Sequence, residues 1–221
     1  FFLFSIENGS DRWMSMKIEK VINNNVVSAV EENGTEVVVM GKGVGFQMRH
    51  GMTIPEEQIE KVFRLDNPSS MDQFKNLVAS LPPERLQIST EVIQYAKGVL
   101  NKKLSPNIYL TLTDHINFAI ERIGQGIKPE NALLWEIKQY YPSEFKVGVQ
   151  SLSILRKMLR IELPVDEAAF IALHFITAEY DTKMDVTFDI PRLIDDIIAI
   201  VESEFSIKID KESIHYERFI T

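Results

Sequence analysis

The chain contains no cysteine among its 221 residues. Disulfide frameworks and thiolate metal sites are therefore excluded. The chain also lacks an apolar run near the roughly 18 residues that a membrane-spanning helix needs. Its opening apolar stretch, residues 1–4, is too short for a signal-peptide core and has no basic residue before it. We therefore expect a cytoplasmic protein without membrane insertion.

A surplus of positive charge is absent as well. The 24 lysines and arginines are outnumbered by 32 aspartates and glutamates, which gives a formal net charge of -8. Proteins that bind nucleic acids usually carry a basic surplus, so the composition argues against that class unless positive potential is local. Hydrophobic residues make up 45% and charged residues 25%, close to globular averages. The length predicts one or two domains with a real core.

The N-terminal quarter has the pattern of a small β domain. Residues 1–15 show neither helical nor strand periodicity, and we interpret them as a non-native or upstream extension. β-Branched and apolar runs follow at residues 17–22, 26–30, 35–40 and 59–65. The pair Asn33-Gly34 between two of these runs is a strong hairpin signal. Several short strands in about 50 residues predict a small antiparallel sheet or barrel that dimerisation would support.

Helical patterns begin after residues 67–70. Residues 71–81 are interpreted as a connecting helix that ends at Pro82-Pro83. The next region is predicted to form a bundle of five helices, over residues 89–100, 105–123, 129–140, 143–160 and 164–180. A polar linker at 181–189, a helix from Ile190 to Phe205 and an amphipathic stretch at 211–221 complete the chain. The predicted fold class is multidomain α+β.

A glycine-rich stretch follows one predicted strand, with glycine at positions 41, 43 and 45. It superficially resembles a phosphate-binding loop, but both nucleotide fingerprints need a helix immediately afterwards. Residues 47–53 have no helical period, and the glycine spacing matches neither fingerprint. Two interpretations remain: a bulge or tight turn, or a loop that nucleic acid approaches closely beside Lys42 and Phe46.

Three consecutive asparagines, Asn23 to Asn25, predict a turn. Asparagine amides can also read base edges, Phe46 could stack on an unpaired base, and Lys20 or Lys42 could meet phosphates. The local charge does not favour RNA binding, because seven glutamates face six lysines and arginines between residues 16 and 65. The pattern alone leaves a plain turn as the default.

Two histidines lie on predicted helices, His115 beside Ile116 and His174 beside Phe175. The simplest interpretation is that both are core histidines with satisfied hydrogen bonds. A metal site is disfavoured, because neither position has local ligand spacing. The functional alternative is a phosphoryl acceptor, since neutral imidazole offers a nitrogen lone pair near pH 7.

Several motifs together resemble one known family. Residues 16–25 (MKIEKVINNN) and 37–46 (VVVMGKGVGF) closely resemble the co-antiterminator RNA-binding domain of the BglG/SacY family of transcriptional antiterminators. Residues 112–116 (LTDHI) and 170–174 (FIALH) resemble the two histidine motifs of that family's first phosphotransferase-regulation domain, and residues 131–136 (NALLWE) also fit it. The resemblance extends over residues 16–221.

The resemblance implies a domain organisation. Residues 16–70 would form a dimeric four-stranded antiparallel RNA-binding domain, and residues 71–82 a helical linker. Residues 83–184 would form the first regulation domain, an all-α bundle of five helices that also dimerises. Residues 185–221 would be the start of a truncated second regulation domain.

The resemblance also implies a mechanism, in which the dimer binds a leader-mRNA hairpin and prevents terminator formation. The RNA-contact positions would be Lys20, Asn23, Asn25, Gly41, Lys42 and Phe46. His115 and His174 would be phosphorylated, with Asp114 in support. The partners would be a sugar permease (enzyme II) and a phosphocarrier protein of the phosphotransferase system, responding to a sugar such as a β-glucoside. The resemblance implies no cofactor, no metal and no enzymatic activity.

Two other classes fit the sequence less well. A histidine phosphocarrier or phosphotransferase component would use His115 as a covalent intermediate, but no sugar or nucleotide site is visible. A DNA-binding activator with similar regulatory domains would need an N-terminal helix-turn-helix. The β-rich region from Met16 to Leu65 argues against that, so DNA is not expected as a partner.

Overall fold

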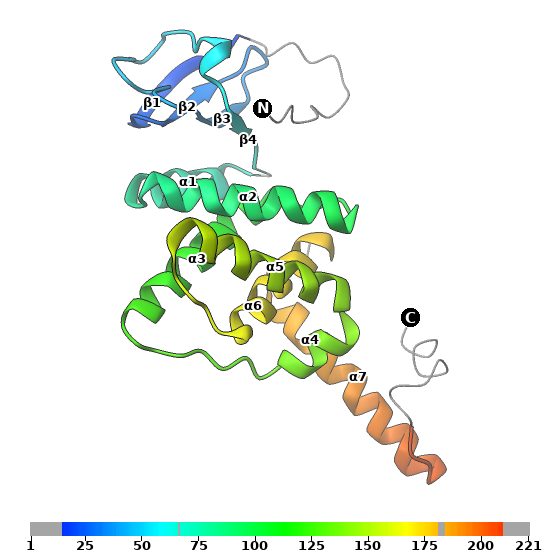
Figure 1. The fold of residues 1–221 in the computed structure, drawn as a ribbon. Coiled ribbons are helices and arrows are strands. Elements are labelled where there is room, and N and C mark those ends of the chain that lie inside the picture. The colour runs from blue at the N-terminus through cyan, green and yellow to red at the C-terminus, as the bar shows by residue number, and fades with distance from the viewer. Residues whose placement is uncertain (1–14, 66, 181–183, 210–221) are drawn as a thin grey trace. The chain divides into compact units, whose positions relative to one another are not determined.

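The computed structural model describes residues 15–65, 67–180 and 184–209 (Figure 1). The chain divides into two compact units, residues 1–86 and 87–221. The interpretation of residues 1–15 as an extension and the amphipathic stretch predicted at 211–221 lie outside the described residues, apart from Ser15. A β unit followed by a helical unit confirms the predicted multidomain α+β class.

Unit 1 contains a four-stranded antiparallel sheet in the order β1-β2-β3-β4. The predicted hairpin at Asn33-Gly34 is confirmed: Gly34 adopts φ +85°, which glycine reaches without strain, and Asn33 Oδ1 accepts the Thr35 amide at 2.8 Å. The β-branched runs therefore pair as expected. The strands are β1 (Lys17–Asn23), β2 (Val26–Val30), β3 (Glu36–Met40) and β4 (Lys61–Phe63).

The outer edge of β1 is not free. Its pairing with β2 contains two register shifts. On the opposite side, residues 51–54 run against it: the Ile18 amide donates to the Met52 carbonyl at 2.9 Å, and the Ile54 amide donates to the Met16 carbonyl at 3.0 Å. The first part of this edge strand therefore already has hydrogen-bond partners within unit 1.

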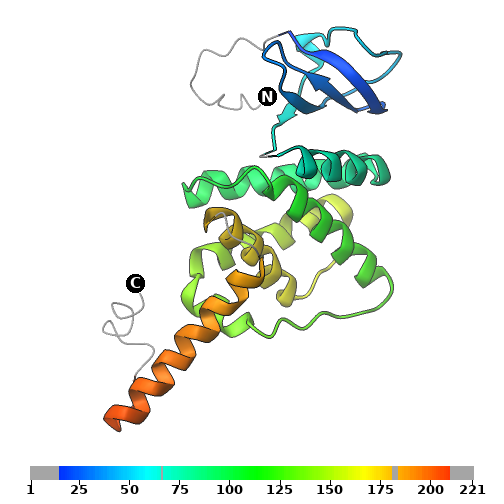
Figure 2. The ribbon, with the colours of Figure 1, turned by 180° about the vertical axis from the view of Figure 1, so that it is seen from behind.

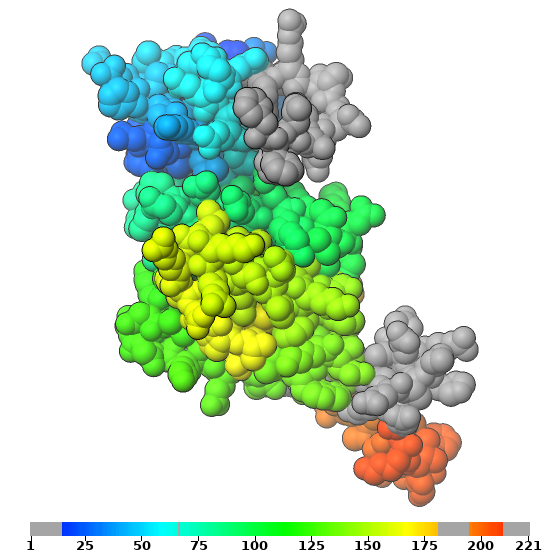
Figure 3. All heavy atoms as spheres, viewed as in Figure 1, coloured from blue at the N-terminus to red at the C-terminus, as the bar shows by residue number. Residues whose placement is uncertain are grey.

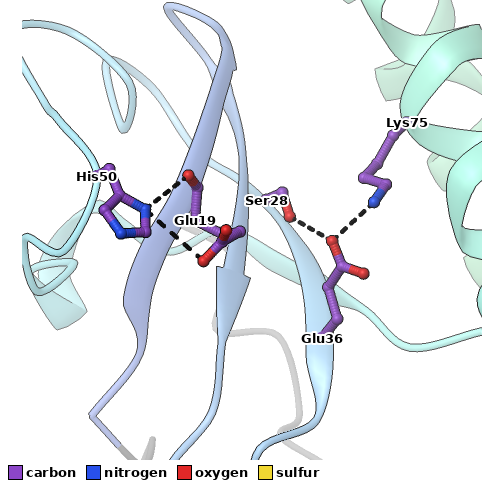
Figure 4. Close-up of polar contacts among 5 residues, drawn as sticks. All are labelled: Glu19, Ser28, Glu36, His50 and Lys75. Atoms are coloured by element: carbon purple, nitrogen blue, oxygen red, sulfur yellow. Dashed lines mark hydrogen bonds and ion pairs between the residues drawn. The ribbon is translucent and has the colours of Figure 1, made fainter.

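Both faces of the sheet are covered. One face carries a buried apolar cluster made of alternate strand residues and residues from the long β3–β4 connection: Met16, Ile18, Val27, Ala29, Val37, Val39, Val44, Ile54 and Val62. The other face meets α1 (Pro68–Ser80), where Phe63 and Phe74 pack with ring centroids 5.1 Å apart. Lys75 of α1 also reaches Glu36 of β3, with Nζ 2.7 Å from Oε1 (Figure 4). The helix interpreted as a connection is thus packed on the sheet.

Unit 2 is helical. Five helices lie in the region where a bundle of five was expected, and α7 packs on two of them, α4 and α6. Tyr140 Oη donates to Asp195 Oδ1 at 2.8 Å and links α4 to α7. The helices are α2 (Pro83–Leu100), α3 (Ile108–Gly124), α4 (Leu134–Tyr140), α5 (Pro142–Leu159), α6 (Val165–Tyr180) and α7 (Met184–Phe205).

Three helix starts differ from the predictions by five residues or more. α2 begins at Pro83 rather than at residue 89, because a proline is well suited to the first helical position and does not end the pattern. α4 begins at Leu134 rather than at residue 129, because Asn131 Oδ1 accepts the Leu133 amide at 2.9 Å and holds a turn there. α7 begins at Met184, so the linker predicted at 181–189 was wrong over 184–189, and Ile190, the predicted first residue of this helix, lies inside it.

α6 is the central helix of unit 2 and packs against α3, α4, α5 and α7 (Figures 1 and 2). The approach of α5 is close at Gly148, where an added Cβ would lie 2.1 Å from the Ala168 carbonyl oxygen. The segment that joins α5 to α6, drawn in yellow in Figure 3, lies on the surface of this unit. No helix within the described ranges is long and apolar enough to cross a membrane.

Candidate functional site

The asparagine turn and the glycine loop are joined at one end of the sheet. Asn23 Oδ1 accepts the Asn25 amide at 2.9 Å, and Asn25 Oδ1 accepts the Gly43 amide at 2.9 Å. Two backbone bonds add to this: the Gly41 amide donates to the Asn25 carbonyl and the Gly45 amide to the Asn24 carbonyl, each at 3.0 Å. Turn and loop are therefore held as one rigid surface.

Glycine is required in this loop because backbone approaches backbone. A Cβ on Gly41 would lie 1.7 Å from the Gln58 carbonyl oxygen, and one on Gly45 would lie 2.2 Å from the Asn23 carbonyl oxygen. The residues after the loop form turns and no helix, so the tight-turn interpretation is confirmed and a nucleotide-binding loop is absent here.

The side chains displayed on this surface suit a single-stranded or looped nucleic acid. Phe46 is 61% exposed, and Lys42 is exposed in the same loop. Lys20 is exposed on β1, three residues before Asn23. In the described part of the chain neither lysine side chain has an ion-pair partner. The structure thus brings together five of the six predicted positions, with Lys20 close by along the strand.

Residues that follow Phe46 were not singled out from the sequence. Gln47, Met48, Arg49 and Met52 line a shallow hollow in unit 1. They lie in residues 47–53, which have no helical period, and no spacing in the sequence indicates that they form a hollow.

A second group of candidate functional residues lies between α3 and α6. On α3, His115 and Arg122 are seven residues apart, and on α6 Glu167 and His174 are seven apart, so each pair shares one helix face. His115 Nε2 lies 3.1 Å from Glu167 Oε2, and Arg122 donates to Glu167 Oε1. The His115 and His174 ring centroids are 4.8 Å apart. Both predicted histidines therefore belong to one site.

The pKa values of Glu167 and His174 are shifted for different reasons. Burial alone would raise the pKa of Glu167, whose side chain is fully buried, but His115 and Arg122 outweigh burial and lower it. Burial lowers the pKa of His174 well below its usual 6.5, and the neighbouring His115 lowers it further. At neutral pH the site therefore holds an ionised Glu167 and an uncharged His174.

The pKa of His174 predicts a loss of stability in mild acid. Above pH 6.5 both folded and unfolded chains hold His174 neutral; below it only the unfolded chain takes up the proton. The free energy of unfolding should therefore fall as pH drops below 6.5, by at most about 1.4 kcal/mol per pH unit from this group. Urea unfolding at pH 7.5, 6.5 and 5.5 measures it. His174→Phe should reduce the dependence of the unfolding free energy on pH, whereas His50→Ala, which removes an exposed histidine, should not.

The sequence predicted some residues of this site and missed others. Asp114 is exposed and makes no hydrogen bond or ion pair with any described residue, so its supporting role stays a prediction. The carboxylate that contacts His115 is Glu167, which the sequence analysis missed together with Arg122. One signal was available in the sequence: Arg122 follows His115 by seven residues, and Glu167 precedes His174 by seven, so each shares a helix face with one histidine.

The structure joins a small antiparallel domain, whose loop exposes Phe46 and Lys42, to a helical domain that pairs two histidines. This combination fits the class of nucleic-acid-binding regulators with a helical control domain. Comparisons with known proteins agree. Residues 16–72 match the CAT RNA binding domain family, and residues 90–178 match the PRD domain family.

Similar proteins identify the family within this class of regulators. The chain is 48% identical over 206 residues to the transcription antiterminator LicT of Bacillus subtilis, covering 93% of this chain and 74% of LicT. It is 38% identical to the Beta-glucoside operon antiterminator of Dickeya chrysanthemi, covering 93% of this chain and 73% of that protein. The crystal structure of GlcT CAT-PRDI matches with a TM-score of 0.67 and 34% identity, covering 75% of this chain and 98% of GlcT CAT-PRDI. The chain belongs to the BglG/SacY family of transcription antiterminators: it is an RNA-binding regulator of antitermination controlled through its PRD domain.

Proposed function

We propose that residues 16–70 bind a hairpin in a leader mRNA as a homodimer and prevent the competing terminator from forming. The observation that carries this is the rigid loop surface, which presents Phe46 and the exposed Lys42 beside the asparagine turn, with the exposed Lys20 on β1. The Asn23 and Asn25 side-chain oxygens already accept backbone amides, so their NH2 groups remain to donate to base acceptors.

The acidic composition is compatible with this proposal because the contact is local. Unpaired RNA bases are recognised by stacking and amide hydrogen bonds more than by phosphate neutralisation. With Lys20 and Lys42 as the main cations of the surface, log affinity against log salt should have a slope of only about -2 per protomer. A much steeper slope would contradict a surface that acts by stacking and amide contacts.

Phe46→Ala should weaken binding of the leader hairpin by roughly 5- to 150-fold, because one base loses its aromatic stacking partner. Gel shifts of the full chain with the hairpin measure the change. Tyr95→Ala, which removes an aromatic side chain from α2 in the other unit, should leave the affinity unchanged. Equal affinity of Phe46→Ala and the natural chain would remove Phe46 from the RNA surface.

We further propose that His115 and His174 accept phosphoryl groups from the phosphotransferase system, through its phosphocarrier protein and a sugar permease. The paired, partly accessible imidazoles between α3 and α6 support this role. A relative is named a β-glucoside operon antiterminator, and we take a β-glucoside as the sugar sensed. Added phosphoryl charge next to the ionised Glu167 would loosen the packing of α3 on α6 and disfavour the RNA-binding dimer.

Phosphorylation with labelled phosphocarrier protein and permease tests the switch. The natural chain and His50→Ala should take up label and bind the hairpin more weakly afterwards. His115→Ala should lose most of the label, and His115→Asp should bind RNA weakly without phosphorylation. If phosphorylation left both RNA affinity and dimerisation unchanged, the histidines would not form an inhibitory switch.

A further inference from the structure

The contact between His115 and Glu167 determines which ring nitrogen of His115 carries a proton. His115 Nε2 lies 3.1 Å from Glu167 Oε2. A carboxylate can only accept hydrogen bonds, so Nε2 must donate. Arg122 donates to the other oxygen of Glu167 and keeps the carboxylate ionised. A neutral imidazole has one N–H, and its lone pair therefore lies on Nδ1.

The two histidines differ in how accessible this second nitrogen is. Nδ1 of His174 is buried and makes no hydrogen bond within the described part of the chain. Nδ1 of His115 also makes no hydrogen bond with any described residue, but it is not among the buried unpartnered atoms, and 14% of the His115 side chain is exposed. His115 thus presents a free lone pair at an accessible edge of the cluster.

We propose that Nδ1 of His115 is the atom that accepts the phosphoryl group and that Glu167 is the residue that positions it, an inference that rests on the phosphorylation proposed above. The donor is a phosphohistidine of a carrier protein. The Nδ1 lone pair forms the new P–N bond while the donor's P–N bond breaks, and that electron pair returns to the donor's ring nitrogen. The proton on Nε2 stays in place.

Glu167 has a second effect on the same step. Attack by a neutral ring leaves the phosphorylated imidazole with a formal positive charge shared with Nε2–H. The Glu167 carboxylate already contacts that N–H and offsets the charge as it develops. A buried carboxylate holding the far nitrogen of a reacting histidine is the arrangement that fixes tautomer and orientation in Ser-His-Asp triads. Glu167 touches no phosphorus atom, so it acts as a positioning residue.

The regiochemistry of phosphohistidine tests the proposal directly. The full chain, with ¹⁵N-labelled histidine, is phosphorylated in parallel by charged phosphocarrier protein and by phosphoramidate, a small donor. ¹H–¹⁵N and ³¹P spectra then identify the nitrogen bonded to phosphorus. We expect phosphorus on Nδ1 of His115 with the proton retained on Nε2. Phosphorus on Nε2 of His115 overturns this inference and leaves the proposed function intact, whereas an unlabelled His115 with both donors overturns both.

A variant separates positioning from folding. Glu167→Gln keeps the side-chain shape but offers both a donor and an acceptor, so the tautomer of His115 is no longer fixed. We expect labelling of His115 to slow at least about tenfold and to be divided between the two nitrogens. Glu144→Gln is the matched control, since Glu144 is also almost fully buried in unit 2 but pairs with Lys102, at 2.6 Å. Labelling of Glu167→Gln at the natural rate and on the natural nitrogen would contradict the proposal.

Discussion

Gly41→Ala should reduce affinity for the leader hairpin by more than about 100-fold, the loss expected when several contacts of one surface move together. The added Cβ would lie 1.7 Å from the backbone oxygen of Gln58, a separation that no side-chain rotation relieves. The loop must move away from η1 (Glu56–Gln58), and Lys42 and Phe46 move with it. Gel shifts and thermal unfolding monitored by circular dichroism measure both consequences.

Gly34→Ala is the control for this prediction. Gly34 also lies in unit 1 and has φ +85°, so alanine introduces backbone strain of about 1–2 kcal/mol. An added Cβ meets nothing within 4 Å, and the hairpin turn is remote along the strands from the asparagine turn. Gly34→Ala should therefore lower stability and leave RNA affinity intact. If the two variants lost affinity equally, general destabilisation would explain the effect of Gly41→Ala.

Glu167→Ala should destabilise the helical unit by about 3–5 kcal/mol, because it removes the partner of Arg122 in a nearly buried site. The unpaired guanidinium and the His115 N–H would each lose a hydrogen-bond acceptor. The midpoint of thermal unfolding should fall by roughly 10–25 °C for a unit of this size. Differential scanning calorimetry at pH 7.5, where Glu167 is ionised, measures the loss.

Two comparison variants make this result specific. Glu162→Ala removes an ion pair with Arg156 in which both side chains are at least 70% exposed, and it should cost less than about 1 kcal/mol. Glu167→Leu combined with Arg122→Met removes both charges together and should recover most of the stability lost by the single change. A single Glu167→Ala change no more harmful than Glu162→Ala would mean that the cluster contributes little to folding.

Local patterns in the sequence predicted most of the fold. The Asn33-Gly34 turn and the β-branched runs around it specify a hairpin without long-range information. The starts of α2 and α4 were misplaced because local signals have two meanings: Pro83 reads as a terminator of one helix or the first residue of the next. Asn131 holds a turn only because its side chain folds back onto the chain.

The candidate sites show where sequence patterns stop being informative. His115 and His174 were recognisable as residue types on helical faces and by family resemblance. Glu167 was not, because a glutamate in the first turn of a predicted helix is ordinary and its burial depends on Arg122 from another helix. The glycines of the loop were visible as a pattern, but the reason for Gly41 is its contact with Gln58, which the distance along the chain hides.

The covered edge of β1 has a consequence for how copies of this chain associate. An open edge strand invites another strand to continue the sheet, which leads to swapped or fibrous assemblies. Here residues 51–54 occupy the start of that edge, and the two register shifts bend what remains away from a flat ladder. Pairing of two chains through the start of β1 is therefore blocked, and the expected dimer must use another surface. Covering this edge removes one route to open-ended association of the chain.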